Sequence, residues 1–288
     1  MKRLTLFTLF VSLCTFASLA APKDRTSERQ GWGDDLPLYG KVKSIAFIHH
    51  SAAEVESGEY RANPTGKVFC SYTFNRRGDV REEVFYNSDG SVGQKNIYKY
   101  GGFRRLLNEK IIQNSDGSVS ERILYHYGPK RRIKERIWCS SDYTLKKKSL
   151  HTYNKKGLET ERVMLNKAGA VIEKTIFKYD KSKNKIEKAV YNAAGALREK
   201  TFYKYNAKGY ISEKVIQNGK GAQLEKELYK YNAEGHMIES SNYNRNGKLA
   251  ARLRYKYDTH GNLVEITSSK QGRTPPIGVI EFRIDYRN

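Results

Sequence analysis

The sequence predicts an all-β protein in which tandem antiparallel β-hairpins of 26 or 27 residues form one long twisted or curved meander sheet. Its composition is the first observation. The chain is hydrophilic, with a mean hydropathy of −0.74, yet it is 12% aromatic and contains 21 tyrosines. Disordered chains are poor in aromatic residues and rich in proline, whereas this chain has only 6 prolines and tyrosine favours strands. A recurring aromatic pair and recurring glycines are the second and third observations.

The aromatic pair has the form Tyr-x-Tyr and recurs every 26 or 27 residues. Its eight copies are Tyr72/Phe74, Tyr98/Tyr100, Tyr125/Tyr127, His151/Tyr153, Phe177/Tyr179, Tyr203/Tyr205, Tyr229/Tyr231 and Tyr255/Tyr257, followed by a degenerate copy at Phe282/Ile284. Such self-similarity at a fixed period is the signature of a repeat architecture.

Glycines occupy two fixed positions in each repeat. They are Gly78, Gly157, Gly209, Gly235 and Gly261 at the first position, and Gly90, Gly117, Gly169, Gly195, Gly221, Gly247 and Gly272 at the second. Glycine supplies the positive φ that hairpin turns require. In the most regular copy, residues 210–217 form one strand, 218–221 a turn and 222–231 the next strand. Short connections allow only antiparallel pairing, so we expect a meander of roughly 16 to 18 strands.

Each strand is predicted to have two mixed faces, because side chains alternate along a strand. In 197–205, one face carries Leu197, Glu199, Thr201, Tyr203 and Tyr205, and the other carries Arg198, Lys200, Phe202 and Lys204. We therefore expect one partly buried face and one wet face. Open sheets of more than about ten strands usually curl or flatten, so the predicted shape is a curved partial shell or a single-layer ribbon.

Two series of charged residues accompany the aromatic pairs. The acidic series is Glu82, Glu135, Glu161, Glu187, Glu213, Glu239 and Glu265, with Asn108 in the second repeat; the basic series is Lys95, Arg122, Lys148, Lys174, Lys200, Lys226 and Arg252. Opposite charges on neighbouring strands can pair. The simplest interpretation is a solvated face that alternating charge keeps soluble.

The N-terminus predicts export. Lys2 and Arg3 precede the apolar stretch 4–16, and small residues around Ala20 suit cleavage, so 1–20 reads as a signal peptide. A short buried helix, or a lipoprotein acylated at Cys14, are the alternatives. We expect the mature protein at the periplasm, the cell surface or outside the cell. No apolar run is long enough for a transmembrane helix.

The predicted organisation has four parts after the signal peptide. Residues 21–36 form a flexible leader with Trp32 as an anchor, and 37–68 form N-terminal capping strands. Residues 69–267 form the hairpin repeats, and 268–288 form a C-terminal capping strand. Terminal units of repeat arrays are expected to differ from the rest because they cap the stack.

The repeats resemble the YD repeats of the Rhs-type family. The segment LRYKYDTHGNLVEIT (253–267) carries the resemblance, and YKYNAEGHMIE (229–239) and YKYNAKGYISE (203–213) are similar, with Asn in place of Asp. FKYDKSKNKIE (177–187) keeps the Asp but lacks the glycine. The resemblance implies a small exported repeat protein of the bacterial envelope, in a family often described as carbohydrate-associated. The chain is too short to close a large shell.

No constellation of residues predicts catalysis, a cofactor or a metal site, so we expect a protein that is not an enzyme. His49 and His50 are adjacent, and adjacent strand residues point to opposite faces, which suits a shared metal poorly. His126 and His151 occupy regular repeat positions. Cys70 and Cys139 lie several strands apart in the predicted sheet, so two packed thiols are expected rather than a disulfide.

A basic stretch with aromatic residues is the best binding candidate. Its residues are Lys130, Arg131, Lys134, Arg136 and Trp138, together with Arg132. The chain also carries a net charge of +22, which favours polyanions. We predict binding of polysaccharide or another anionic envelope polymer along these residues and the tyrosines Tyr203, Tyr205, Tyr229, Tyr231, Tyr255 and Tyr257. The alternative is a structural scaffold whose sheet edges pair with a protein partner; nucleic acid is the less favoured polymer. Burial of the tyrosine face would argue against glycan stacking.

Overall fold

The computed structural model describes residues 38–54, 60–62, 65–102, 106–269 and 278–287. The elements are β1 (Val42–His50), β2 (Ala52–Glu54), β3 (Tyr60–Ala62), β4 (Lys67–Phe74), β5 (Val80–Tyr86), β6 (Val92–Gly101), β7 (Leu106–Asn114), β8 (Val119–Tyr127), η1 (Pro129–Arg131), β9 (Ile133–Cys139), β10 (Leu145–Tyr153), β11 (Glu159–Asn166), β12 (Val171–Tyr179), β13 (Lys185–Asn192), β14 (Leu197–Tyr205), β15 (Ile211–Asn218), β16 (Gln223–Tyr231), β17 (Met237–Asn244), β18 (Leu249–Tyr257), β19 (Leu263–Ser269) and β20 (Gly278–Tyr286). The described part of the chain contains no helix with the length and hydropathy needed to span a bilayer.

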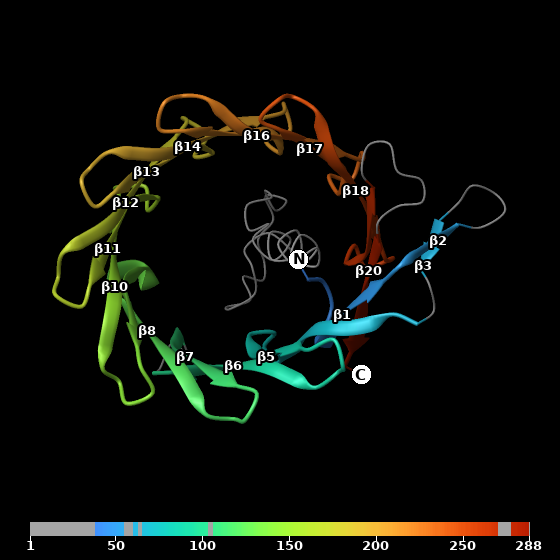
Figure 1. Cartoon of the computed structure of the whole chain (residues 1–288), viewed down its shortest axis with the longest axis horizontal. Helices are drawn as coiled ribbons and strands as arrows, with labels where there is room; N and C mark the ends of the chain where they lie inside the picture. Colours follow the sequence, from blue (N-terminus) through green and yellow to red (C-terminus); the bar gives the residue numbers. More distant parts are fainter. Residues whose placement is uncertain (1–37, 55–59, 63–64, 103–105, 270–277, 288) are drawn as a thin grey trace, which may run out of the picture.

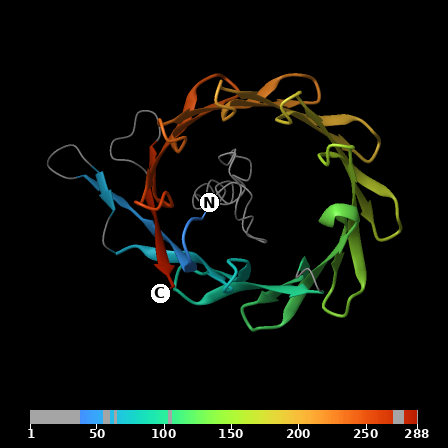
Figure 2. The ribbon, with the colours of Figure 1, turned by 180° about the vertical axis from the view of Figure 1, so that it is seen from behind.

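Eighteen strands form one sheet that closes on itself into a barrel, seen as a ring in Figure 1 and from behind in Figure 2. From β4 to β20, each strand pairs antiparallel with the next along the chain, and β1 pairs with both β20 and β4. The predicted antiparallel hairpins are confirmed. The predicted open shell or ribbon is wrong, because β1 fills the place between the last and the first hairpin and leaves the sheet no free edge.

The turns explain why Asn or Asp precedes glycine by three residues. In the turn 206–210, the Asn206 N–H donates to the Tyr210 carbonyl at 2.8 Å, and the Gly209 N–H donates to the Asn206 carbonyl at 2.9 Å. Asn206 Oδ1 also accepts the N–H groups of Lys208 and Tyr210, each at 3.0 Å. Gly209 has a φ of +84°, which costs glycine no steric strain. All the predicted turn glycines except Gly272, which lies outside the described residues, have positive φ.

The densest core lies where β1 closes the barrel. Ile45, only 1% exposed, lies between Ile284 of β20 and Tyr72 of β4. The Phe47 ring lies 4.7 Å from that of Phe282 and 5.6 Å from that of Tyr72, measured between centroids. Aromatic and aliphatic burial of this kind is the main favourable term in folding. The closure of the barrel is therefore held by packing as well as by backbone hydrogen bonds.

The tyrosines of the repeat face the inside of the barrel. The segment 38–41, dark blue, lies inside the ring in Figures 1 and 2. Leu38 of this segment packs in the same core cluster as Val80, Tyr98 and Leu107. The cross-strand registers place Tyr203 and Tyr205 on this inner face, and Lys200 and Lys204 on the outer face, as the alternation predicted.

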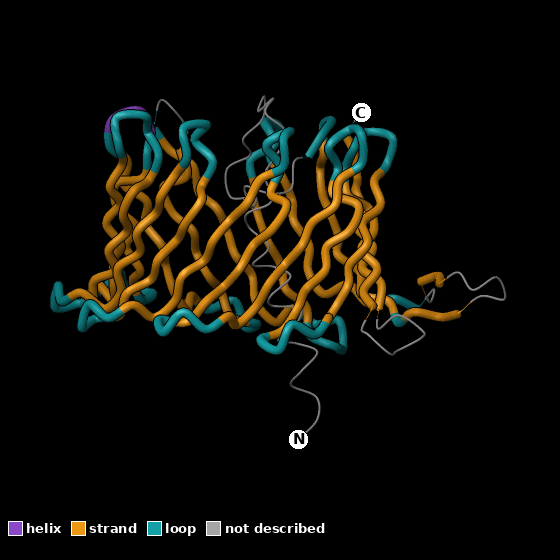
Figure 3. Tube along the Cα trace, turned by 90° about the horizontal axis from the view of Figure 1, so that it is seen from above, coloured by secondary structure: helices purple, strands orange, loops and turns teal. Residues whose placement is uncertain are grey.

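The barrel has two edges, which we name from the side view in Figure 3. The upper edge carries η1, the C-terminal end of β20 and the turns that follow the Tyr-x-Tyr pairs. The lower edge carries the other turns and the hairpin of β2 and β3, which projects from it. In an antiparallel meander, successive turns lie at opposite ends of the strands. Each edge of the barrel therefore receives one turn per repeat.

Some predictions about segments fall outside the described residues: the signal peptide 1–20, acylation at Cys14, and the leader 21–36 with Trp32. Residues 37–68 contain β1, which pairs with β4 and β20, and residues 268–288 contain the final strand, β20, which pairs with β19 and β1. The predicted capping role of these two segments stays a prediction. Cys70 and Cys139 are buried thiols, as expected.

Candidate functional site

The six tyrosines predicted to bind glycan are covered rather than displayed. Tyr203 and Tyr229 are each 8% exposed. Tyr205, Tyr231, Tyr255 and Tyr257 are half-buried. Glycan stacking needs accessible ring faces, so this burial disfavours the predicted role, which stays a prediction.

The second tyrosine of each pair has a structural contact that explains its recurrence. The β13–β14 ladder ends at Glu187 and Phe202, and the Tyr205 hydroxyl donates to the Lys185 carbonyl beyond that end at 2.7 Å. The same bond, always to a carbonyl 20 residues earlier, is made by Tyr100, Tyr127, Tyr153, Tyr179, Tyr231 and Tyr257. These hydroxyls satisfy carbonyls where successive hairpins diverge at the upper edge.

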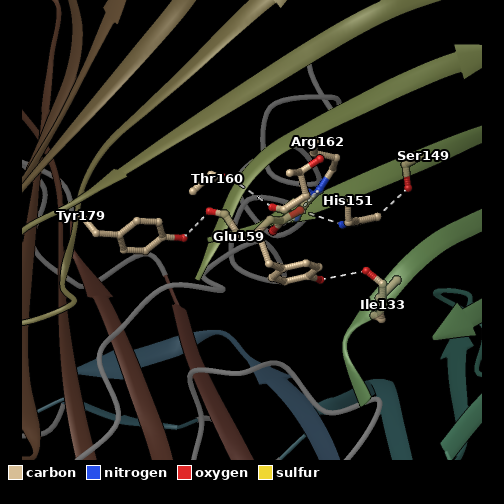
Figure 4. Close-up of polar contacts among 9 residues, drawn as sticks. Ile133, Ser149, His151, Glu159, Thr160, Arg162 and Tyr179 are labelled. Atoms are coloured by element: carbon tan, nitrogen blue, oxygen red, sulfur yellow. Dashed lines mark hydrogen bonds and ion pairs between the residues drawn. The ribbon is translucent and has the colours of Figure 1, made fainter. Parts of the chain in front are cut away.

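One repeat replaces the first tyrosine by His151, and a polar cluster surrounds it (Figure 4). Ser149 Oγ lies 2.8 Å from His151 Nε2, and His151 Nδ1 lies 2.7 Å from Glu159 Oε1. Arg162 donates to both oxygens of Glu159, at 2.9 and 2.8 Å. Burial alone would raise the pKa of Glu159, but the hydrogen bonds to His151 and Arg162 outweigh it and lower this pKa to about 2.

The hydroxyl, imidazole and carboxylate of this cluster are linked in the same order as in a serine–histidine–carboxylate catalytic triad. The burial of the cluster indicates a structural role instead. Ser149 has 0% exposure, so a substrate carbonyl cannot reach its hydroxyl. Sequence reasoning treated His151 only as a variant of tyrosine, since nothing in the local sequence shows that Glu159 lies opposite it. We assign the cluster to the stability of the inner wall.

The outer face carries the two predicted charge series, and they pair across strands. Glu213 lies 2.6 Å from Lys204 on the preceding strand and 2.8 Å from Lys226 on the following strand, measured from oxygen to nitrogen. Similar bridges join Glu187 to Lys178 and Lys200, Glu239 to Lys230 and Arg252, and Glu135 to His126 and Lys148. In the second repeat, Glu109 rather than Asn108 holds this place, between Lys99 and Arg122. The cross-strand pairing is confirmed.

Acid should weaken these bridges. Hydrogen bonds from Lys204 and Lys226 lower the pKa of Glu213, so its contribution to stability is present above the usual carboxyl pKa and is lost as pH falls through the lowered one. We expect Glu213→Gln to lower the urea midpoint at pH 7 and to match the wild type more closely at pH 3. The control is Glu234→Gln, in an exposed turn, which should show the same small difference at both pH values. A Glu213→Gln effect that is equal at pH 7 and pH 3 would contradict the assignment.

The two edges differ in charge. In the seven fully described upper-edge turns, ten basic residues face four acidic ones; in the seven described lower-edge turns, four basic residues face three acidic ones. Six exposed cations lie in three consecutive upper turns: Lys130, Arg131, Lys155, Lys156, Lys181 and Lys183. We call these six residues the basic rim. Sequence reasoning found its first two members but not the others, because turns 26 residues apart in sequence become neighbours only at the edge.

Three members of the basic rim have strained backbones. Lys130 and Arg131 each have a φ of +59°, and Lys183 has a φ of +70° at the position that glycine holds in most other turns. The left-handed conformation costs a residue with a Cβ about 1–2 kcal/mol. Among the described residues other than glycine, Tyr143 is the remaining case of positive φ. Strain of this kind often marks functional positions, and here it coincides with exposed positive charge.

The structure separates the predicted basic stretch. Lys130 and Arg131 lie in the basic rim, whereas the Arg132 guanidinium packs 5.6 Å from the centre of the Tyr153 ring. Lys134 is exposed near the upper edge. Arg136 and Trp138 face inward, with Arg136 over Tyr125 and Lys147 over Trp138, so the six residues do not form one patch. The binding role predicted for each of them stays a prediction.

Comparison with known proteins adds little to what the structure shows. A family model described as "Uncharacterised protein" matches residues 169–260. No curated protein matches the chain. A porin-like protein from Bacteroides uniformis is 11% identical over 86% of this chain and 99% of its own, with a TM-score of 0.43. A porin-like protein from Bacteroides vulgatus is 10% identical over 85% and 98%, with a TM-score of 0.37. The TcdB2-TccC3 structure is 12% identical over 74% of this chain but only 16% of its own, with a TM-score of 0.23.

These comparisons correct the family resemblance. The YD-repeat assignment is contradicted, because the family model that matches residues 169–260 carries another description. The hairpins also close into an 18-stranded barrel. The sequence repeat itself remains, and its Tyr, Asn and Gly positions are explained by the turn and hydroxyl contacts described above.

Proposed function

We propose that this protein is an exported, non-enzymatic barrel of the bacterial envelope that binds an anionic polysaccharide at its upper edge, through the basic rim. Export rests on the N-terminal pattern of charge and apolar residues. The observation that carries the binding proposal is the unequal distribution of charge between the described turns of the two edges. If the positive charge served only to keep the protein soluble, the two edges would not need to differ in charge.

The spacing of the basic rim suits a polymer. Successive upper turns are two strands apart, which corresponds to roughly 10 Å, so three turns present cations over roughly 20 Å. Asp180 is the one acidic residue in these turns, and it accepts hydrogen bonds from the backbone and side chain of Asn184, at 2.8 and 3.0 Å. A chain with regularly spaced carboxylate or sulfate groups could contact several turns at once. Electrostatic attraction of this kind weakens with salt.

A polysaccharide fits the rim better than a nucleic acid. Binding of single-stranded nucleic acid combines cations with aromatic rings on which bases stack. The aromatic residues that directly precede the three rim turns are half-buried, and their hydroxyls are bonded to the backbone; they are Tyr127, Tyr153 and Tyr179. The rim therefore offers charge without a stacking platform.

The outer wall favours an aqueous location within the envelope. One row of directly paired outer residues across β12 to β16 reads Lys178, Glu187, Phe202, Val215, Lys226. A wall that faces lipid needs an apolar band about 25 Å tall, and an Arg or Lys at the bilayer midplane costs roughly 2–4 kcal/mol. In this row only two neighbouring residues are apolar and charged residues stand on both sides of them, which favours an aqueous location for the barrel.

A structural scaffold is the second candidate, and the burial of the tyrosine ladder favours it. The sequence analysis expected a scaffold to bind its partner by pairing a strand with a free sheet edge. The barrel wall cannot bind a partner in this way, because every wall strand is paired on both sides. Among the strands that the structure describes, only those of the β2–β3 hairpin have a free edge for strand addition.

Heparin-column retention tests the proposal. The rim variant Lys155→Gln/Lys156→Gln/Lys183→Gly should elute at clearly lower salt than the wild type. The matched control, Lys167→Gln/Lys220→Gln/Arg245→Gln, removes the same charge from exposed positions of the lower edge and should elute close to the wild type. Lys183→Gly alone should raise the unfolding midpoint, since it relieves a positive φ, while it weakens retention.

Two results would remove the basic rim from consideration. One is equal loss of retention in the two triple variants, which would show that only net charge matters. The other is stronger competition by single-stranded DNA than by soluble heparin at equal charge concentration, which would make nucleic acid the better ligand.

A further inference from the structure

A cavity of about 490 Å³ lies at the upper edge, where the barrel closes. Three segments that are distant in sequence meet there: the stretch before β1, the turn between β4 and β5, and the residue after β20. The lining residues are Gly40, Lys41, Val42, Asn75, Arg76, Arg77, Gly78 and Arg287. The cavity exists only because β1 lies between β4 and β20, so we call it the seam pocket.

The seam pocket is strongly basic. Four of its eight lining residues are cations, and none is a carboxylate. Asp79, which follows the lining residue Gly78 in sequence, is held by Arg77 Nη2 at 2.7 Å and by Asn75 Nδ2 at 3.0 Å. Asp285 lies 3.1 Å from Lys43. The charges of Lys41, Arg76 and Arg287 are thus not balanced by a carboxylate within the lining.

Arg287 is held in place with one donor left over. Its backbone N–H donates to the Lys41 carbonyl at 2.8 Å, and its Nη2 donates to the Phe74 carbonyl. Its Nε–H is buried and has no hydrogen-bond partner within the described structure. The guanidinium is positioned before any ligand arrives, which lowers the entropic cost of binding.

We propose that the seam pocket binds a phosphate monoester, either as a free sugar phosphate or at the phosphorylated end of a glycan. Arginine is the residue best suited to phosphate, because its planar fork matches two phosphate oxygens. Pockets that take small ligands have volumes of about 300–1,000 Å³, so this one has room for the phosphate and its sugar. The proposal goes beyond polymer binding at the basic rim and does not rest on it, since the two sites share no residue.

Calorimetric titration at constant ionic strength tests the seam pocket, with inorganic phosphate and glucose 6-phosphate as probes and chloride as the background anion. The wild type should bind both. Arg76→Gln should weaken binding about tenfold or more, because it removes a charge-assisted contact. The matched control is Arg245→Gln, an exposed arginine of the lower edge, which should leave the affinity unchanged.

Arg287→Gln should also weaken binding, but Arg287 contacts the Phe74 carbonyl and its loss affects folding as well. Arg76 is exposed, so its variant decides the question. Tighter binding of glucose 6-phosphate than of inorganic phosphate identifies recognition of the sugar as well as of the phosphate group, and equal binding identifies recognition of the phosphate group alone. No binding by the wild type, or equal weakening in Arg76→Gln and Arg245→Gln, would overturn the proposal. The Lys155→Gln/Lys156→Gln/Lys183→Gly variant should keep its phosphate affinity, so the rim and the seam pocket can fail separately.

Discussion

Glu83→Ala should destabilise the protein by about 3–5 kcal/mol, because it leaves a half-buried cation and three hydrogen-bond donors without their acceptor. Glu83 accepts hydrogen bonds from Asn96 Nδ2 at 2.6 Å, from the Tyr98 hydroxyl at 2.9 Å and from the Tyr72 hydroxyl. Lys110 Nζ lies 3.4 Å from the same carboxylate. Burial alone would raise the pKa of Glu83, but Lys110 and these hydrogen bonds lower it, so the group is charged at neutral pH. Urea unfolding at pH 7 measures the effect.

The adjacent residue provides a matched control. Glu82→Ala makes the same chemical change on the outer face, where Glu82 pairs only with half-buried Lys95 at 3.2 Å. A surface ion pair contributes about 0–1 kcal/mol, so the Glu82 variant should unfold close to the wild type. Similar losses for the two variants would mean that the inner and outer faces do not differ as the registers indicate.

Ile45→Ala should destabilise the barrel by about 2–5 kcal/mol, the range for a large aliphatic residue that leaves a cavity in a packed core. Ile45 lies on the strand that closes the ring and contacts the core on both sides of the seam. Loss of packing there should also favour opening between β1 and its neighbours, which would expose two strand edges. We therefore expect a lower urea midpoint together with concentration-dependent aggregation before the main unfolding transition.

Ile186→Ala is the control for this prediction. Ile186 is 38% exposed on β13, within the repeat and distant from the seam in strand order. Its truncation should change stability much less and should not promote aggregation. If Ile45→Ala has an effect no larger than that of Ile186→Ala, the seam is not the weak point of the barrel.

The local sequence pattern was sufficient to predict the hairpins. Asn206 and Gly209 define a turn through contacts that span five residues, and the alternation in 197–205 assigns each side chain to a face. Both are set by interactions between residues close in sequence, which a single repeat displays in full. The charge series was also readable, since Glu213 and its partners recur at constant offsets from the aromatic pairs.

Much less of the candidate sites could be predicted from the sequence. The basic rim joins Lys130, Lys156 and Lys183, which are about one repeat apart in sequence and meet only at the upper edge. The sequence pointed instead to residues 130–138 as one stretch, and alternation along β9 sends Arg136 and Trp138 inward. The seam pocket joins Arg76 to Arg287, and no local signal relates these two positions.

By itself, the sequence determined an antiparallel meander of copied hairpins with aromatic and charged positions in register, because those features depend on short-range turn chemistry and on the two-residue period of a strand. Only the tertiary structure decided that the meander closes, that the tyrosines line the inside and that cations gather at one edge. Closure depends on a single non-repeated strand, β1, whose Phe47 pairs with Phe282 of β20 at the other end of the chain as well as with Cys70 of β4. A periodic pattern describes each hairpin and its neighbour, and it contains no information on where the first hairpin meets the last.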